Sequence, residues 1–224
     1  MKRILFVFTS ANKNLAGGQT GYYLPEAAHP YYVLSGKYHL DFASPKGPNP
    51  TVDEYSVQAF PDDVPKFLEN PAVQAKLAAA KRLADVKAAD YDAIFYIGGH
   101  GPVIDLPQDP ANIKLAGEFW RAGKLTTAVC HGPAALVNVT DAQGASIFRG
   151  RRATAFANEE EELMNAVKAV PFLVEDRIKE LGGKYEKAAE PFDPKVVVDG
   201  MLITGQNPAS AKGVAEAIDQ ALSA

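Results

Sequence analysis

The sequence predicts an α/β protein in which helices cover both faces of a mostly parallel sheet. Three short apolar runs rich in β-forming residues, at 4–8, 93–97 and 125–129, are typical of strands buried on both faces. Segments with helical spacing or helix caps alternate with these runs, as expected when helices connect parallel strands. The chain has 224 residues, of which 47% are hydrophobic, so it can bury one sizeable core, and we expect a single domain over residues 1–224.

The N-terminal half begins with a β-α-β unit and continues into a more polar segment. In order, we predict a strand at 4–8, a helix at 24–34, a strand at 40–43, a surface loop at 44–57 and a helical segment at 61–89. Asn70 and Pro71 form an N-cap and first-turn pair within that last segment. Residues 44–90 contain no strand pattern that would build a second core, so we expect them to be an excursion of the same domain.

The C-terminal half alternates strands and helices again. In order, we predict a strand at 93–97, a helix from Asp109 to 123, a strand at 125–129, helices around 159–167 and 171–181, a hairpin of strands at 196–198 and 201–204, and a helix from Asn207 to about 222. Asp199 and Gly200 form the turn of the hairpin. Sheets of this kind bind ligands at the carboxyl ends of their strands, so the residues that follow the strands are the first candidates for a site.

The composition excludes several classes of partner. Lys and Arg total 23 against 27 Asp and Glu, a net charge of −4 with no basic run, so we expect no nucleic-acid partner. The apolar run at 4–8 is too short for a signal peptide or a membrane span, and we expect no membrane partner. The single cysteine cannot form an internal disulfide. These features predict a cytoplasmic protein in a reducing compartment.

Cys130 stands where a buried strand turns into the next segment, in the sequence AVCHGP. Gly132 permits a tight turn, and Pro133 suits a first helical turn because no backbone donor is needed there. A sulfur at such an elbow lies near the positive end of the following helix, which lowers the pKa of a thiol and favours a nucleophilic thiolate. The alternative is that Cys130 is a small buried hydrophobic residue.

The glycine cluster at 98–101 directly follows the strand at 93–97. The backbone amides of Gly98 or Gly99, together with that of His131, are placed to form an oxyanion hole beside Cys130. The alternative is a glycine-rich turn that backbone geometry alone requires.

Two further acids are candidates near the cysteine. Glu26 lies early in the first predicted helix among small apolar neighbours, where a partly buried carboxyl would have a raised pKa and could move a proton. The alternative is an acid that the helix dipole favours in a first turn. The acidic run at 159–162 offers a residue to orient His131, although most of that run is expected to be solvated.

Neither a metal nor a nucleotide is predicted. His29 and His100 have no spacing that makes a metal site with Cys130 convincing. The glycine-rich loop at 17–21 and Asp41 fail the dinucleotide fingerprint, because the glycine spacing is wrong and the loop is too far from the strand end.

These segments together resemble the DJ-1/PfpI superfamily, and within it the Hsp31-like group that includes glutathione-independent glyoxalases. The elbow AVCHGPAAL, the double glycine and Glu26 are specific to the superfamily. The segments GGHGP and GQNPAS narrow the resemblance to the Hsp31-like branch, and the similarity runs nearly end to end.

The resemblance implies a flavodoxin-like sandwich that usually forms a homodimer. It implies that Cys130 is the nucleophile, that Glu26 meets its sulfur and that an acid five positions beyond Phe156 completes His131. That acid is Glu161, with Glu160 open as the neighbouring register. The implied activity is that of a glyoxalase III-type lyase, which converts methylglyoxal and other 2-oxoaldehydes to D-lactate and other 2-hydroxy acids without a cofactor or metal.

The same resemblance allows other activities. A stress-responsive holding chaperone and a protein deglycase are the main alternatives, and oxidation of Cys130 in redox sensing is compatible with catalysis. An amidotransferase would need a histidine late in the chain, but the last histidine is His131.

Overall fold

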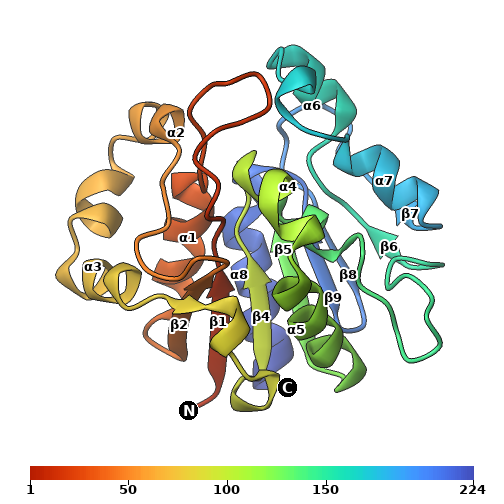
Figure 1. Ribbon diagram of the computed structural model, residues 1–224, viewed down its shortest axis with the longest axis horizontal. Helices are drawn as coiled ribbons and strands as arrows, with labels where there is room; N and C mark the ends of the chain where they lie inside the picture. The colour runs from red at the N-terminus through yellow and green to blue at the C-terminus, as the bar shows by residue number, and fades with distance from the viewer.

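A seven-stranded sheet runs through the centre of the computed structural model, which describes residues 1–224 (Figure 1). The strand order is β3-β2-β1-β4-β5-β9-β8, and every neighbouring pair is parallel except β8 and β9. The strands are β1 (Arg3–Val7), β2 (His39–Ser44), β3 (Lys81–Arg82), β4 (Ala93–Tyr96), β5 (Leu125–Val129), β8 (Val196–Asp199) and β9 (Leu202–Gly205). A separate parallel pair joins β6 (Arg152–Ala153) and β7 (Lys184–Tyr185).

The five strands β2, β1, β4, β5 and β9 stand in the flavodoxin-like order 2-1-3-4-5 when they are counted among themselves. The strand β3 extends one edge and the antiparallel β8 extends the other. The predicted fold class is therefore confirmed. Because the chain passes from β1 to β2 on one side and then to β4 on the other, the carboxyl ends of β1 and β4 form the switch point where such folds bind ligands.

Helices pack on both faces of this sheet. They are α1 (Leu24–Leu34), α2 (Glu54–Ala59), α3 (Pro71–Ala78), α4 (Gly101–Asp105), α5 (Pro110–Arg121), α6 (Asn158–Leu163), α7 (Val174–Glu180) and α8 (Ala211–Ser223). One core holds Phe6 and Phe95 of the sheet with the buried sides of α1 and α8, and the other holds Leu5 and Ile94 with α5. Alternate residues of each strand therefore enter opposite cores. None of the helices is long and apolar enough to cross a membrane.

Most predicted elements are present, with bounds that differ by a few residues. The helical segment predicted at 61–89 is wrong as one unit, because it is divided into a π-helix at Val64–Leu68, α3, the short strand β3 and two 3-10 turns. The helix at 24–34 and the strand at 125–129 are confirmed as α1 and β5. The segment predicted as a loop at 44–57 contains the start of α2, because the Asp53 side chain accepts a hydrogen bond from the Ser56 amide at 3.0 Å and caps a short helix.

The segments around the C-terminal elements are shorter or later than predicted. Helix α6 ends at Leu163, and α7 begins at Val174. The final helix begins at Ala211, after a 3-10 turn at Pro208–Ser210. The Asn207 side chain does not cap a backbone amide, because its Oδ1 atom accepts from the Ser210 hydroxyl at 3.0 Å, while its Nδ2 atom donates to Glu160 and to the Asp193 carbonyl. Asn207 is therefore part of a tertiary network rather than a local helix start.

Candidate active site

Cys130 follows the last residue of β5 and lies in the left-handed region of backbone conformation, with φ +59°. Its amide donates to the Gly205 carbonyl at 2.9 Å, and its own carbonyl accepts from the Phe156 amide at 2.9 Å. These two bonds fix a conformation that a residue with a side chain rarely adopts. The sulfur is thus held on a strained strand-to-turn elbow at the carboxyl edge of the sheet.

Gly98 and Gly99 allow three chain segments to meet beside this elbow. A Cβ atom on Gly98 would lie 2.3 Å from Glu26 Oε2 and 2.7 Å from Cys130 Cβ. Gly99 has φ +101°, and its amide lies against the Cys130 sulfur. The Gly98 carbonyl accepts from the Tyr23 amide at 3.0 Å, which ties the end of β4 to the start of α1. Any larger residue at Gly98 would push the acid and the thiol apart.

Glu26 lies in the first turn of α1 and is completely buried. Neither of its carboxyl oxygens has a hydrogen bond of ordinary geometry, although the Cys130 thiol and the Gly98 amide lie beside them. Burial raises the pKa of this carboxyl well above its usual value, and those two neighbours lower it by less. Burial therefore favours the protonated form of Glu26, whose carboxyl group faces the sulfur.

Burial also raises the pKa of the Cys130 thiol well above its usual value, and negative charge on Glu26 would raise it further. The Gly99 amide acts in the opposite direction without offsetting burial. The lowered pKa expected from the sequence is wrong for this resting state. The following helical segment is only the five-residue 3-10 turn Gly132–Leu136, whose dipole is too short to outweigh desolvation. These surroundings favour the protonated thiol.

The imidazole of His131 lies beside the thiol. Its Nδ1 atom lies 3.3 Å from Cys130 Sγ, and its Nε2 atom lies 2.6 Å from Glu161 Oε2. Burial lowers the pKa of His131 despite the attraction of Glu161, so the ring is neutral. Burial alone would raise the pKa of Glu161, but the imidazoles of His131 and His100 outweigh it and hold that pKa well below its usual value. The Glu161 carboxylate accepts from Nε2–H, which leaves Nδ1 free to accept the thiol proton.

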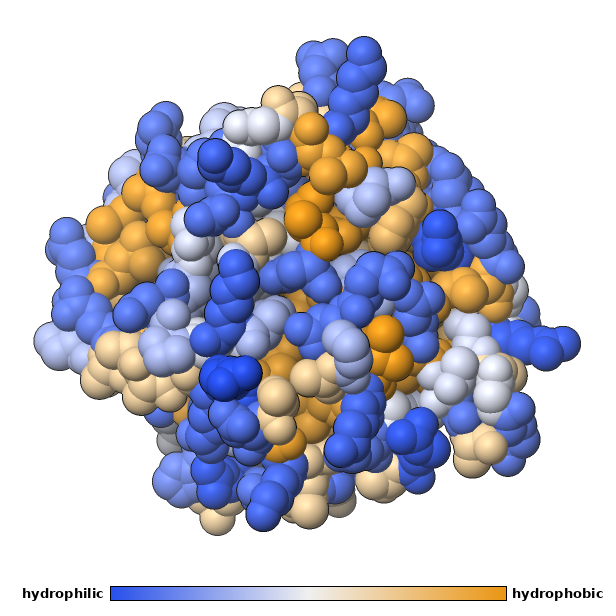
Figure 2. Space-filling view, in the orientation of Figure 1, coloured by the Kyte–Doolittle hydropathy of each residue, from blue (hydrophilic) through white to orange (hydrophobic).

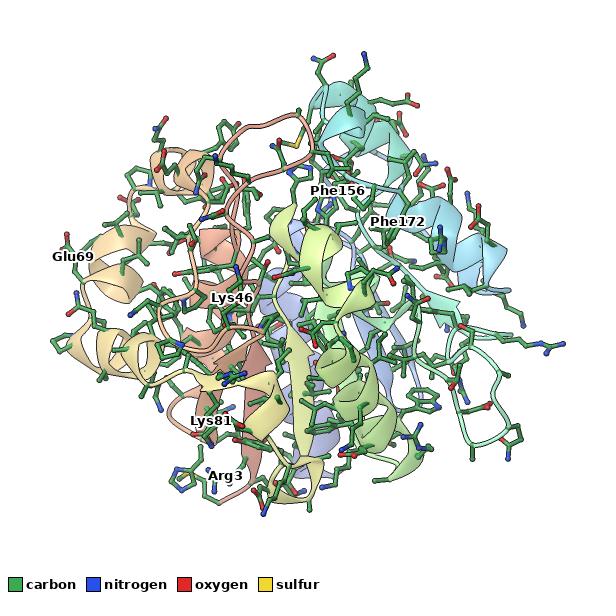
Figure 3. All side chains as sticks on the ribbon, in the orientation of Figure 1. Arg3, Lys46, Glu69, Lys81, Phe156 and Phe172 are labelled. Atoms are coloured by element: carbon green, nitrogen blue, oxygen red, sulfur yellow. The ribbon has the colours of Figure 1, made fainter.

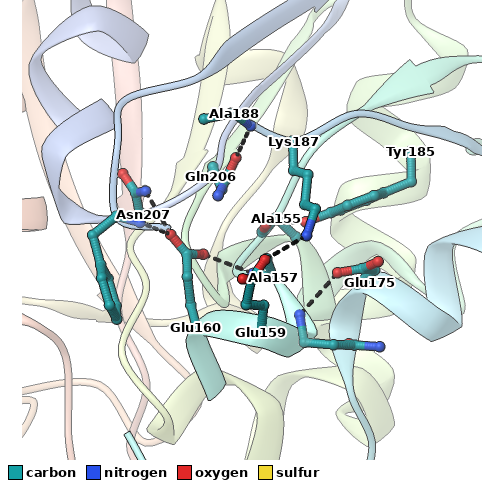
Figure 4. Close-up of polar contacts among 12 residues, drawn as sticks. Ala155, Ala157, Glu159, Glu160, Glu175, Tyr185, Lys187, Ala188, Gln206 and Asn207 are labelled. Carbon is teal, nitrogen blue, oxygen red and sulfur yellow. Dashed lines mark hydrogen bonds and ion pairs between the residues drawn. The ribbon is translucent and has the colours of Figure 1, made fainter. Parts of the chain in front are cut away.

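The sequence left open whether Glu160 or Glu161 contacts His131, and the structure places them in different surroundings. Glu161 contacts both imidazoles of the site. The fully buried Glu160 carboxylate accepts instead from the amides of Ala157 and Phe192 and from the Asn207 side chain, each at 2.8 Å (Figure 4). Adjacent positions at the start of α6 therefore face different surroundings, with Glu161 beside the thiol–imidazole pair and Glu160 beside the chain before β8.

His100 is a member of the site that sequence reasoning considered only as a metal ligand. Its Nε2 atom lies 2.5 Å from Glu161 Oε1, and its ring centroid lies 4.4 Å from that of His131. In the sequence, the feature that indicated a place for His100 in the site was its position directly after the glycine pair at the end of β4. The ligand atoms of His100, His131 and Glu161 lie within 4.8 Å of one another, so a metal bound here would replace both imidazole–carboxylate hydrogen bonds.

A cavity of about 510 Å³ opens onto the thiol. It is lined by Gln19, Tyr23, Asp53, Tyr55, Ala59, Phe60, Gly99, His100, Cys130, His131, Phe156, Met164, Phe192, Asn207, Pro208 and Ala209. Figure 3 shows Phe156 near the end of the molecule that carries α6, with Arg3 at the opposite end. Gly98, Glu26 and Glu161 lie behind the residues that line the cavity.

The DJ-1/PfpI family matches residues 26–220 of this chain. Glyoxalase 3 of Candida albicans is 30% identical over 96% of both chains, and the glutathione-independent glyoxalase HSP31 of Saccharomyces cerevisiae is 31% identical over 96% of this chain and 95% of that protein. The solved structure of the 24-kDa rapid encystment protein of Francisella tularensis is 35% identical, covers 99% of both chains and superposes with a TM-score of 0.93. The chain, with its buried acid and its cysteine elbow, therefore belongs to the DJ-1/PfpI family and to its Hsp31-like group.

Proposed function

We propose that the chain is a glutathione-independent glyoxalase that converts methylglyoxal and other 2-oxoaldehydes to D-lactate and other 2-hydroxy acids. One observation carries the proposal. The Cys130 thiol lies at a cavity between a neutral imidazole, 3.3 Å from the sulfur, and the buried carboxylic acid of Glu26. Such an arrangement supplies a nucleophile, a base and an acid from the protein itself. The names of its relatives in two yeasts point to the same reaction.

The first step forms a covalent adduct. His131 Nδ1 takes the thiol proton, and the sulfur attacks the aldehyde carbon of the substrate. The aldehyde oxygen becomes an alkoxide near the amides of Gly99 and His131 and then takes the proton from the imidazolium, which gives a neutral hemithioacetal. Glu161 stabilises the transient positive charge on His131, because its carboxylate accepts the Nε2–H bond at 2.6 Å.

The second step moves hydrogen between the two adjacent carbons. His131 removes the proton from the former aldehyde carbon while Glu26 gives its proton to the ketone oxygen, which forms an enediol. The imidazolium then protonates the second carbon, and Glu26 takes back a proton from the hydroxyl of the first. The product is a 2-hydroxy thioester on Cys130, with both Glu26 and His131 in their starting states.

The third step releases the acid. A water molecule, activated by His131, adds to the thioester carbon and breaks the carbon–sulfur bond. The products are the 2-hydroxy acid, which ionises in solution, and the Cys130 thiol. The net reaction adds one water to the 2-oxoaldehyde, so it needs no external oxidant or reductant.

A methylglyoxal assay without glutathione tests the proposal on the wild type, Cys130→Ser and Glu26→Gln. We expect both variants to lose at least about a hundredfold in kcat/KM, the scale for removal of a nucleophile or a general acid. Glu162→Gln is the matched control, because Glu162 is exposed in the same acidic run as Glu161. Turnover retained by the serine variant would exclude covalent catalysis.

The proposal includes a homodimer in the cytoplasm that acts on a small molecule rather than on nucleic acid or membrane. The resemblance to the Hsp31-like group supports the dimer, and the net charge of −4 agrees with the absence of a nucleic-acid partner. Light scattering on the purified protein measures the subunit number, and a monomer at micromolar concentration would contradict the dimer.

A holding chaperone is the second candidate, because apolar side chains are exposed around α6. Hydrophobic side chains gather on this part of the surface (Figure 2). Leu163 is 59% exposed, Val167 40% and Leu15 59%, and the Leu15 amide donates to the Ala169 carbonyl, which brings the N-terminal loop to this region. Suppression of client aggregation by Cys130→Ala at the wild-type level, and its loss in Leu163→Glu, would support this activity. Suppression that Leu163→Glu leaves unchanged would contradict it.

A further inference from the structure

The cavity is much larger than methylglyoxal, the named substrate of the proposed reaction. Methylglyoxal has five non-hydrogen atoms and, at roughly 20–30 Å³ for each, the share that a water molecule takes in the liquid, it fills roughly 100–150 Å³. The cavity of about 510 Å³ is in the range of sites that enclose drug-sized ligands. Most of the space beyond Cys130 is therefore available to a substituent larger than a methyl group.

The lining beyond the reactive groups suits an apolar and planar substituent. Ring centroids follow one another from His131 to Phe156 at 4.5 Å and from Phe156 to Phe192 at 6.4 Å. Tyr23 and Phe60 form a second aromatic pair in the lining, with centroids 5.9 Å apart and the rings edge to face. No lysine or arginine lines the cavity, so an anionic substituent would find no partner there.

Phe192 is held at the cavity in an unfavourable state. Its φ is +65°, which is rare for a bulky residue, and 43% of its surface is exposed. Its amide donates to Glu160 Oε1 at 2.8 Å, and the same oxygen accepts from Asn207 Nδ2 at 2.8 Å. Figure 4 shows the Glu160 carboxylate between the Asn207 side chain and the backbone at Ala157.

The positive φ and the exposed ring of Phe192 both cost stability, so a purely structural role does not explain them. A buried, fully used carboxylate overdetermines its backbone, while its ring stays in contact with solvent and the cavity. Strain of this kind clusters at sites that bind ligands. A planar group in the cavity would cover the exposed ring.

We propose that the preferred substrates are 2-oxoaldehydes with an aryl or comparably large apolar substituent, and that Phe192 determines this specificity by packing against the substituent. The proposal rests on the glyoxalase function proposed above and names its substrate class. The reactive dicarbonyl end lies at Cys130, and the substituent lies along Phe156 and Phe192.

Turnover of phenylglyoxal and methylglyoxal without glutathione gives the first test. We expect the wild type to have a kcat/KM about tenfold or more higher for phenylglyoxal, and Phe192→Ala to reduce that ratio by about two- to tenfold, the value of one aromatic contact. Phe192→Tyr keeps the ring and should restore the ratio. Phe172→Ala is the matched control, because Phe172 is a phenylalanine outside the cavity lining, and it should leave the ratio unchanged.

Binding of unreactive analogues separates this proposal from the glyoxalase function. The neutral pair 2-hydroxyacetophenone and hydroxyacetone share a head group and differ in phenyl against methyl. By ligand-observed NMR we expect the phenyl compound to bind the wild type at least about tenfold more tightly, and Phe192→Ala to remove most of the difference. Absence of turnover with this binding pattern intact would refute the glyoxalase function alone. Equal affinity for the two compounds, or equal loss in Phe172→Ala, would overturn the proposed specificity.

Discussion

Two glutamates of the site, Glu26 on the α1 side of Cys130 and Glu161 on the α6 side, are buried to nearly the same extent and behave in opposite ways. Glu26 is 0% exposed and Glu161 2% exposed. Glu26 has no hydrogen bond of ordinary geometry, and burial raises its pKa, whereas two imidazoles outweigh burial and lower the pKa of Glu161. Partners rather than burial therefore decide the charge of a carboxyl group here, and the proposed mechanism uses this difference, with an acid on one side of the thiol and an oriented base on the other.

Replacement of the charged glutamate, Glu161, should have the largest effect on turnover. Glu161→Ala removes the acceptor that holds Nε2–H of His131, so the imidazole can turn or change tautomer and Nδ1 no longer faces the thiol reliably. We expect a loss of about ten-thousandfold in kcat/KM for glutathione-free turnover, the order seen when a triad loses its orienting carboxylate. Glu162→Gln is the control. A loss below about tenfold would mean that His131 needs no carboxylate to work.

The raised pKa of Glu26 should change how the free energy of unfolding depends on pH. The pKa of Glu26 is raised by folding, so its contribution to the free energy of unfolding is full below the unfolded pKa of about 4.3 and is lost as the pH rises toward the folded pKa. Glu26→Gln removes this titration. We expect the free energy of unfolding of the variant to gain on the wild type by about 1.4 kcal/mol for each pH unit above about 5, up to the folded pKa.

Urea denaturation of both proteins at pH 5, 6 and 7 measures this gain. Glu162→Gln, which replaces an exposed acid, should run parallel to the wild type over the same range. Parallel curves for Glu26→Gln and the wild type would show that Glu26 ionises normally in the fold, and the acid role assigned to it would fail.

His100 tests how much of the Glu161 effect depends on a second partner, because it is the second imidazole that lowers the pKa of Glu161. His100→Leu leaves Glu161 Oε1 without its donor at 2.5 Å but keeps the contact between His131 and Oε2. We expect a fall of about tenfold in kcat/KM, the scale of one charge-assisted hydrogen bond, and a shift of the acid limb of the pH–rate profile. His100→Gln, whose amide can donate to the same oxygen, should recover most of the activity. An unshifted profile in His100→Leu would assign His100 to packing alone.

The sequence was sufficient for most of the central sheet, the elbow and the first helix, because those depend on local patterns. Continuous apolar runs identified β4 and β5, and the glycines around Cys130 indicated a tight approach of chain segments. The strand β3 was missed because two exposed residues carry no pattern of their own and pair with β2 only in the folded chain.

The chemistry of the site was harder to predict, because it depends on distances that spacing does not encode. The pKa of Cys130 was expected to be low from its place before a helix, but desolvation dominates in the fold. The choice between Glu160 and Glu161 needed the orientation of α6, and the contact of His100 with Glu161 joins residues 61 positions apart. Desolvation and long-range pairing are properties of the packed chain rather than of any segment.

The smallest effect is expected at the other end of the acidic run, where a glutamate has a partner but no burial. The Glu159 carboxylate lies 2.7 Å from Lys187 Nζ, with both side chains largely in water, 51% and 42% exposed (Figure 4). Solvent screens such a pair and side-chain entropy opposes it, so Glu159→Gln should change the free energy of unfolding by less than about 1 kcal/mol and leave methylglyoxal turnover unchanged. Urea denaturation and the same assay measure both. Glu159 has a cationic partner, whereas Glu26 has none. A large effect of Glu159→Gln on the free energy of unfolding would show that a cationic partner is sufficient without burial. A small effect would show that such a partner contributes only where burial excludes water.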